Sequence, residues 1–233
     1  MGSVGPAPVE VGPAIAVRRT PAPLLRAAAV FAILAVALSI WVAWHGIPLP
    51  GDIWLVHQLQ RATTLGKNAR IVNDIGNWLW LFVVAGVLLI LLGGRPWRVA
   101  AVPPKREALA AMAAAIVLSL GDTLLKAALR SPRPSVRFGI HIEGHFSGYG
   151  YPSGHTYNDV LFFGVLAVMA PSYLPRRLVF PARVVSAAII LAAGPSRILV
   201  GAHWPSDTLG GYLWAGAALC IALWFGRWVA GRR

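Results

Sequence analysis

Charge is scarce in this sequence, and acidic residues are scarcer still. Of its 233 residues only 12% are charged and only 8 are Asp or Glu, whereas 57% are hydrophobic. Because about a quarter of the residues in a typical soluble protein are charged, the chain has too few polar residues to cover a soluble fold of this size. Lipid would cover the apolar exterior of a membrane protein. The net charge of +13 is therefore interpreted as a feature of a membrane protein, and no nucleic-acid partner is expected.

Cysteine is nearly absent as well. The one cysteine, Cys220, lies in an apolar run. A single thiol excludes a disulfide within the chain and any metal site built from cysteines. The sequence shows no internal repeat, no pattern typical of β-strands and no separate soluble domain.

Six apolar segments predict the fold class, an all-α, integral membrane bundle of six transmembrane helices. The segments are Ala27–Trp44, Gly76–Leu92, Ala108–Leu129, Thr156–Ala170, Val184–Val200 and Pro205–Trp228. The first and the last are almost the only segments that meet the requirement of roughly 20 apolar residues for a bilayer span. The others are shorter or carry polar residues, which we expect to face the bundle interior because polar groups that face lipid are costly.

One membrane domain, residues 26–233, is predicted to follow a disordered cytoplasmic tail, residues 1–25, which is rich in Pro, Gly, Ala and Val. Arg18 and Arg19, followed by an apolar run, resemble the start of a signal peptide. The run has the length of a full span, however, and no clear small-residue cleavage site follows it. It is therefore interpreted as a retained helix.

Basic residues predict the orientation of the chain. If the N-terminus is cytoplasmic, most of the 21 Lys and Arg residues fall in inside loops and tails, as the positive-inside rule expects. Both termini are then cytoplasmic, and a composition rich in Ala, Arg and Gly suggests a bacterial inner membrane. Most of the remaining basic residues gather at the outer ends of the third and fifth segments, which indicates a function there.

Three stretches share the predicted outer side. The first is KAALRSPRP, residues 126–134, at the end of the third segment. The second is PSGH, residues 152–155, at the start of the fourth segment, and the third is SRILVGAHWPSD, residues 196–207, between the fifth and the sixth. They are far apart in the sequence, but this topology places them at one membrane face. A functional site is therefore predicted near the outer face.

The residues of these stretches suit a phosphoryl group. Lys126, Arg133 and Arg197 supply three cations, and the guanidinium fork matches phosphate oxygens. Ser153 and Gly154 precede a helix, where backbone N–H groups can point at an anion and the helix dipole attracts it. These five residues are the predicted phosphate-binding set, both for the substrate and for the charge on its oxygens in the transition state.

Two histidines supply reactive groups. His155 and His203 can divide the work, one attacking phosphorus and the other protonating the leaving oxygen. Asp207 follows His203 by about one helical turn, and it can fix the tautomer of that histidine. No metal and no cofactor are expected, because the three basic side chains provide the positive charge.

In these motifs the sequence resembles the type 2 phosphatidic acid phosphatase family, whose pattern is KxxxxxxRP, PSGH and SRxxxxxHxxxD. All three parts match in order and in spacing over residues 126–207, and the six-helix layout extends the match. The resemblance implies a helical bundle with its site near the outer membrane face. It also implies that His203 is a nucleophile that forms a phosphohistidine, that His155 is the general acid, and that Asp207 orients His203.

The sequence thus predicts a metal-independent lipid phosphate phosphatase. Its expected partners are the bilayer and a lipid phosphate substrate, and no oligomeric state is predicted. The candidate substrates are a polyprenyl diphosphate, phosphatidic acid, phosphatidylglycerol phosphate and a lipid A phosphate. One alternative is a lipid phosphotransferase, in which an alcohol replaces water. Another is a non-catalytic lipid-phosphate binder or transporter, although binding alone needs no nucleophile.

Four residues near the motifs have open roles. Asp122 lies one turn before Lys126 and is predicted to be its structural partner, with a headgroup contact as the alternative. Arg130 either extends the basic patch or contacts lipid headgroups. His141 and His145 are predicted to be solvated loop residues, with headgroup recognition as the alternative. Their loop, rich in Gly and aromatic residues, is a candidate lid.

Overall fold

Every regular element is a helix in the part of the chain that the computed structural model describes, residues 22–61, 78–92 and 105–232. The elements are α1 (Ala22–His45), α2 (Asp52–Arg61), α4 (Leu79–Leu92), α5 (Lys105–Leu118), α6 (Gly121–Leu129), the 3₁₀ turn η1 (Val136–Phe138), α7 (Gly154–Tyr173), α8 (Arg176–Leu199) and α9 (Pro205–Gly231). The prediction of an all-α fold is confirmed for these ranges. Residues 1–21 of the predicted tail lie outside them, and the rest of that tail, from Ala22, already belongs to α1.

Four elements are long and apolar enough to cross a bilayer, namely α1, α5 together with α6, α8, and α9. They have 24 to 27 residues, against the roughly 20 that a span requires. Helix α4 is apolar but has 14 residues, and Gly76, where that segment was predicted to begin, lies outside the described residues. These helices support an integral membrane protein, and the count of six spans stays a prediction.

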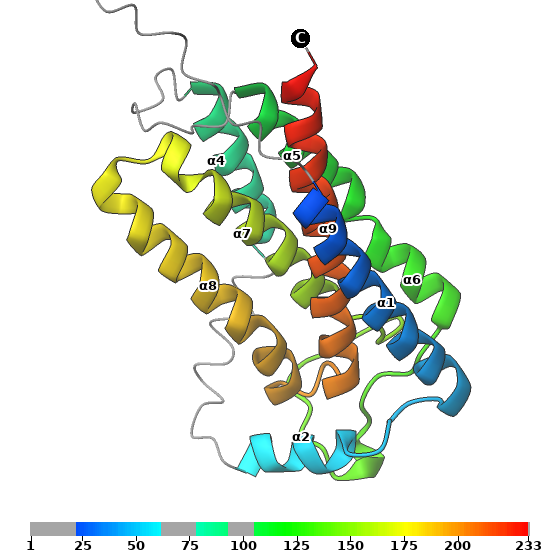
Figure 1. Cartoon of the computed structure of the whole chain (residues 1–233). Helices are drawn as coiled ribbons and strands as arrows, with labels where there is room; N and C mark the ends of the chain where they lie inside the picture. The colour runs from blue at the N-terminus through cyan, green and yellow to red at the C-terminus, as the bar shows by residue number, and fades with distance from the viewer. Residues whose placement is uncertain (1–21, 62–77, 93–104, 233) are drawn as a thin grey trace, which may run out of the picture.

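Helix α9 lies at the centre of the bundle, where it packs against α1, α5 and α7, and α7 packs in turn against α8 (Figure 1). Glycines let these helices approach one another closely. A Cβ atom on Gly216 would lie 2.8 Å from the ring of Phe31 on α1, and one on Gly211 would lie 2.8 Å from the carbonyl oxygen of Ser153. The largest cluster of buried apolar side chains joins α5, α7 and α9.

Polar side chains of the apolar segments face the inside of the bundle. Asp122, Thr156 and Arg197 are at most 7% exposed, whereas Val117 and Leu191 are 67% and 71% exposed. This distribution lets lipid cover the apolar side chains while the polar ones stay away from it. The prediction that polar residues of these segments face the interior is confirmed at these positions.

One end of the bundle gathers the segments that were predicted to carry chemistry. The end of α6, the start of α7, the end of α8 and the start of α9 lie together at the lower end of the bundle in Figure 1, and α2 lies across this end. The three motif stretches therefore meet in space. That this end faces the outside of the cell stays a prediction.

Candidate active site

A cavity of about 410 Å³ lies at this end of the bundle. Its wall comes from α6 and the stretch after it, the loop before α7, the start of α7, and the end of α8 with the turn into α9. Most of the predicted site residues line it, and the other two, Ser153 and Asp207, are fully buried. The lining residues are Lys126, Arg133, His145, Phe146, Ser147, Gly154, His155, Arg197 and His203.

The turn between α8 and α9 explains the spacing from Arg197 to His203. Arg197 lies in the last turn of α8 and is buried. The backbone N–H groups of Ala202 and His203 donate to its carbonyl oxygen at 3.0 and 3.3 Å, so the chain folds back onto the end of the helix. Gly201 permits this turn, because its φ is +71° and a Cβ atom there would run into the carbonyl oxygen of His141. The turn brings a buried cation and a histidine to the same wall.

Asp207 holds the imidazole of His203 from one side. Nδ1 of His203 lies 3.2 Å from Oδ2 of Asp207, and the same oxygen accepts the backbone N–H of Trp204 at 3.0 Å. The two side chains are only 2% and 0% exposed. Because a carboxylate accepts hydrogen bonds, this contact favours the tautomer of His203 that carries its proton on Nδ1. The geometry agrees with the predicted orienting role of Asp207.

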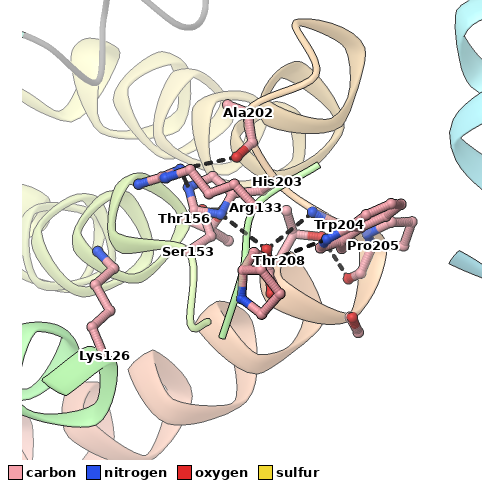
Figure 2. Close-up of polar contacts among 12 residues, drawn as sticks. Lys126, Arg133, Ser153, Thr156, Ala202, His203, Trp204, Pro205 and Thr208 are labelled. Carbon is pink, nitrogen blue, oxygen red and sulfur yellow. Dashed lines mark hydrogen bonds and ion pairs between the residues drawn. The ribbon is translucent and has the colours of Figure 1, made fainter. Parts of the chain in front are cut away.

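Arg133 contacts the other ring nitrogen of His203 (Figure 2), and both side chains line the cavity. Its Nη1 lies 3.0 Å from Nε2 of His203 and 2.9 Å from the carbonyl oxygen of Ala202. Its Nε donates to the carbonyl oxygens of Ser147 and Gly148, at 3.1 and 3.2 Å. A guanidinium group only donates hydrogen bonds, so Nε2 of His203 is the acceptor and carries a lone pair. A nucleophilic nitrogen requires that lone pair.

The surroundings of His203 favour its neutral form. Burial lowers the pKa of His203 well below its ordinary value of 6.5, and the positive charges of Arg133, Arg197 and Lys126 lower it further. Burial also lowers the pKa of Arg133, while the charge of Asp207 opposes this change. Near neutral pH the imidazole is therefore uncharged, which is the state that can attack phosphorus.

A titration of His203 measures this effect directly. In detergent-solubilised protein labelled with nitrogen-15 histidine, we expect the His203 resonance to keep its neutral shift as the pH falls through 6.5, because burial and the nearby cations disfavour the charged ring. The resonance is assigned by its loss in the His203→Ala variant. A titration midpoint at or above 6.5 would contradict the prediction.

Lys126 and Asp122 form an ion pair on α6 that lies against the start of α7. The Nζ of Lys126 lies 2.8 Å from Oδ2 of Asp122, one helical turn earlier, as the sequence predicted. Figure 2 shows the side chain reaching from α6 toward the start of α7. A Cβ atom on Gly154 would lie 2.6 Å from this Nζ and would run into the carboxylate of Asp122. Gly154 therefore lets the Asp122–Lys126 pair lie directly against the backbone at the helix start.

Replacing Gly154 with alanine is expected to lower kcat/KM by up to about 10²-fold, because the new methyl group displaces Lys126 from the cavity, and displacements of about 1 Å can cost that much. The measurement is phosphate release from a lipid phosphate by purified protein. Gly231→Ala is the matched control, since a Cβ atom there meets nothing within 4 Å. Wild-type activity in Gly154→Ala would show that the close approach has no catalytic role.

Ser153 differs from its prediction. Its backbone N–H donates to the carbonyl oxygen of Asp207 at 2.9 Å, and its Oγ accepts the hydroxyl of Thr156 at 3.0 Å. The expectation that this N–H points at a bound anion is therefore wrong, because the start of α9 already uses it. Gly154 supplies the backbone that lines the cavity at the start of α7. Ser153 itself is fully buried and does not line the cavity.

The loop before α7 contributes three wall residues that the motifs do not contain. The ring of Phe146 lies 5.3 Å from the guanidinium carbon of Arg197, a cation–π contact that places the loop next to a predicted phosphate ligand. His145 is exposed, as the sequence predicted, yet it also lines the cavity. In the sequence, only the aromatic and Gly-rich composition of the loop indicated that it lies near the site. The three residues are His145, Phe146 and Ser147.

Two other residues of open role do not line the cavity. The side chain of His141 is 73% exposed and lies 3.5 Å from a carboxylate oxygen of Glu143. This agrees with the prediction of a solvated loop residue. Arg130 ends α6 with a φ of 50°, and its Nε donates to the carbonyl oxygen of Ala127 at 3.2 Å. It is exposed, so it does not extend the basic lining.

Known proteins are similar to this chain in sequence and in fold. Residues 105–230 match the model of the PAP2 superfamily. Lipid A 1-phosphatase of Rhizobium etli is 28% identical over 171 residues, which cover 67% of this chain and 69% of that protein. Phosphatidylglycerophosphatase B of Escherichia coli is 36% identical over 90 residues, which cover 36% of this chain and 32% of that protein. The Bacillus subtilis protein of that name is 29% identical over 96 residues, 39% of this chain and 46% of that protein.

The fold is also that of a solved membrane enzyme. The crystal structure of a PAP2-type phosphatidylglycerolphosphate phosphatase from Bacillus subtilis aligns with a TM-score of 0.68 and 18% identity, over 84% of this chain and 94% of that one. These relatives are all phosphatases of lipid phosphates, and they confirm the prediction of a membrane lipid phosphatase. Since the family model covers all three motif stretches and more than half of the residues, the chain belongs to the PAP2 superfamily.

Proposed function

We propose that this protein hydrolyses a lipid phosphate through a phosphohistidine on His203. The observation that carries the proposal is the pair of contacts on its ring, with Nδ1 at Asp207 and Nε2 at Arg133 beside the cavity. Nε2 forms a bond to phosphorus, and the bond from phosphorus to the lipid oxygen breaks. His155 lies on the same cavity wall. Burial and the neighbouring cations lower its pKa to about 3, and the negative charge of a bound phosphate raises that pKa again, so His155 takes up a proton with the substrate. It then gives this proton to the leaving oxygen. Water then attacks phosphorus, His155 takes a proton from that water, the bond from phosphorus to Nε2 of His203 breaks, and phosphate leaves.

Three cations stabilise the phosphoryl group during both steps. Lys126, Arg133 and Arg197 line the same cavity, and their charges offset the negative charge on the phosphate oxygens in the transition state. Arg133 and Arg197 present planar forks, whereas Lys126 supplies a compact charge. In this mechanism the chain itself supplies the positive charge that phosphoryl transfer needs.

The substrate is an amphiphile that carries a phosphate or diphosphate. The names of the relatives refer to lipid A and to phosphatidylglycerolphosphate, which share a phosphate group on a lipid. The basic cavity of this chain recognises that shared group. Phosphatidylglycerol phosphate, phosphatidic acid, a lipid A phosphate and a polyprenyl diphosphate are the substrates to compare.

The proposed location is a bacterial inner membrane, with both termini in the cytoplasm and the cavity facing the outside. Four apolar helices support the membrane setting, and the distribution of basic residues along the sequence supports the orientation. A cavity on the outer side would meet lipid phosphates of the outer leaflet.

Phosphate release from a panel of these lipid phosphates, in detergent with EDTA and no added metal, tests the proposal. We expect release from at least one of them at the same rate with and without EDTA. Added alcohol that captured the phosphoryl group in place of water would identify a phosphotransferase instead. Binding of every lipid without release of phosphate would contradict the proposed hydrolysis, and loss of activity in EDTA would contradict the metal-free mechanism.

A further inference from the structure

Asp52, the first residue of α2, is a buried carboxylate outside the three motifs and outside the residues that match the family model. It is 5% exposed. Its Oδ1 accepts the backbone N–H of Ser206 at 3.0 Å, and its Oδ2 accepts the Ser206 hydroxyl at 2.7 Å. Oδ2 also accepts the backbone N–H of Leu49 at 2.8 Å. Because a buried charge is costly unless hydrogen bonds compensate it, these three bonds are what keeps the carboxylate in this position.

Helix α9 has no capping side chain at its own N-cap residue. That residue is Trp204, whose side chain makes no capping hydrogen bond. The first N–H groups of a helix have no partner within the helix, and a Ser, Thr, Asn or Asp side chain at the N-cap usually accepts one of them. Ser206 is the second residue of α9, and Asp52 accepts its N–H from 154 residues away. The negative charge of Asp52 also suits the positive end of the helix dipole.

The first turn of α9, which Asp52 caps, contains the carboxylate that contacts the proposed nucleophile. Asp207 follows Ser206 directly, and its Oδ2 lies 3.2 Å from Nδ1 of His203. This distance is at the long end of the range for an N–H···O hydrogen bond, so a small shift of the first turn of α9 would break the contact. The position of the His203 ring therefore depends on how firmly that turn is held.

Other side chains of α2 contact the end of α8 and the start of α9. Val56, one turn after Asp52, is fully buried in a cluster with Ile198 and Trp204. One turn further, Gln60 donates to the carbonyl oxygen of Leu199 at 3.2 Å. These side chains recur at helical spacing and so share one face of α2. Figure 1 shows this helix lying across the end of the bundle where α8 ends and α9 begins.

We propose that Asp52 is a positioning residue for the His203–Asp207 pair. By capping α9 from α2, it fixes the first turn of α9, and through that turn it fixes the carboxylate that orients the nucleophile. The inference rests on the proposed function, because it takes His203 as the nucleophile. It deepens that function by adding a residue on a helix that the three motifs do not include.

The test is the Asp52→Asn variant of the full-length protein, which keeps the shape of the side chain but offers one acceptor oxygen in place of two. We expect kcat to fall by about ten- to a hundredfold and KM to stay within about threefold, because the nucleophile is misplaced while the phosphate ligands remain. We also expect the nitrogen-15 resonances of His203 to shift. Trp54→Ala, on the exposed side of α2 at 65% exposure, is the control and should keep kcat within about twofold.

Ser206→Ala removes the hydroxyl bond at 2.7 Å and leaves the backbone bond. It should lower kcat by about three- to tenfold and the unfolding temperature by only a few degrees, because Oδ2 of Asp52 keeps its bond from the backbone of Leu49. Wild-type kcat and unshifted His203 resonances in Asp52→Asn would overturn the positioning role, and so would a rise in KM at unchanged kcat. Activity that persists in His203→Ala would instead overturn the proposed function, so the two failures are distinguishable.

Discussion

Replacing His203 with alanine is expected to lower phosphate release by at least about 10³-fold, because no other group takes over the bond to phosphorus once the nucleophile is gone. His203 is held on both ring nitrogens, at 3.2 Å from Asp207 and 3.0 Å from Arg133. The measurement is the initial rate of phosphate release from the best lipid phosphate of the panel. Mass spectrometry of rapidly quenched wild-type enzyme should find a phosphoryl group on the peptide that contains His203.

His141→Ala is the control for this experiment. His141 is another histidine near the cavity end, but its side chain is 73% exposed and does not line the cavity. Its substitution should leave the rate within about twofold of the wild type. Substantial activity in His203→Ala, or a phosphoryl group on a different residue, would show that the nucleophile has been assigned wrongly.

Replacing His155 with alanine is expected to have the second-largest effect, about 10²- to 10⁴-fold on a lipid phosphate, because a general acid contributes that much. The size of the effect should depend on the leaving group. An alkoxide leaves poorly without a proton, whereas nitrophenolate leaves readily. With nitrophenyl phosphate the variant should therefore still form the phosphohistidine. It should then stall, since His155 no longer removes the proton from the attacking water.

The expected signature is a burst of nitrophenol, close to one equivalent per enzyme, followed by slow turnover. The wild-type enzyme is the comparison, and it should release nitrophenol at a constant rate without a burst. An equal loss of rate for both substrates, with no burst, would mean that His155 binds phosphate and does not transfer a proton.

Local spacing explains why the contacts of the proposed nucleophile, His203, could be predicted. His203 and Asp207 are one helical turn apart, and the carbonyl oxygen of Arg197 accepts the backbone N–H of His203 at 3.3 Å. These are short-range relations that the order of residues contains. The meeting of the three motifs could be predicted too, because apolar helices of similar length place alternate connections at the same end of a bundle.

Long-range contacts explain what the sequence did not show. The backbone N–H of Ser153 was expected at the anion, but the start of α9 takes it, and that partner is far away in the chain. Asp52 bonds to Ser206 across 154 residues, and a ten-residue helix such as α2 is too short to register as a span. Phe146 packs against Arg197 only because the loop folds back over the bundle. Such pairings depend on tertiary packing, which no spacing rule reports.

The contact between Arg133 and Nε2 of His203 has a consequence for selectivity among reactants. In the proposed mechanism this contact occupies the lone pair that would attack phosphorus, so Arg133 covers Nε2 until a phosphate group arrives. A phosphate group competes for the same guanidinium, since an anion is the stronger acceptor, and by drawing Arg133 onto its own oxygens it uncovers Nε2. In that mechanism the substrate itself exposes the nucleophile, and we expect a neutral electrophile, which cannot draw Arg133 away, to react slowly with Nε2.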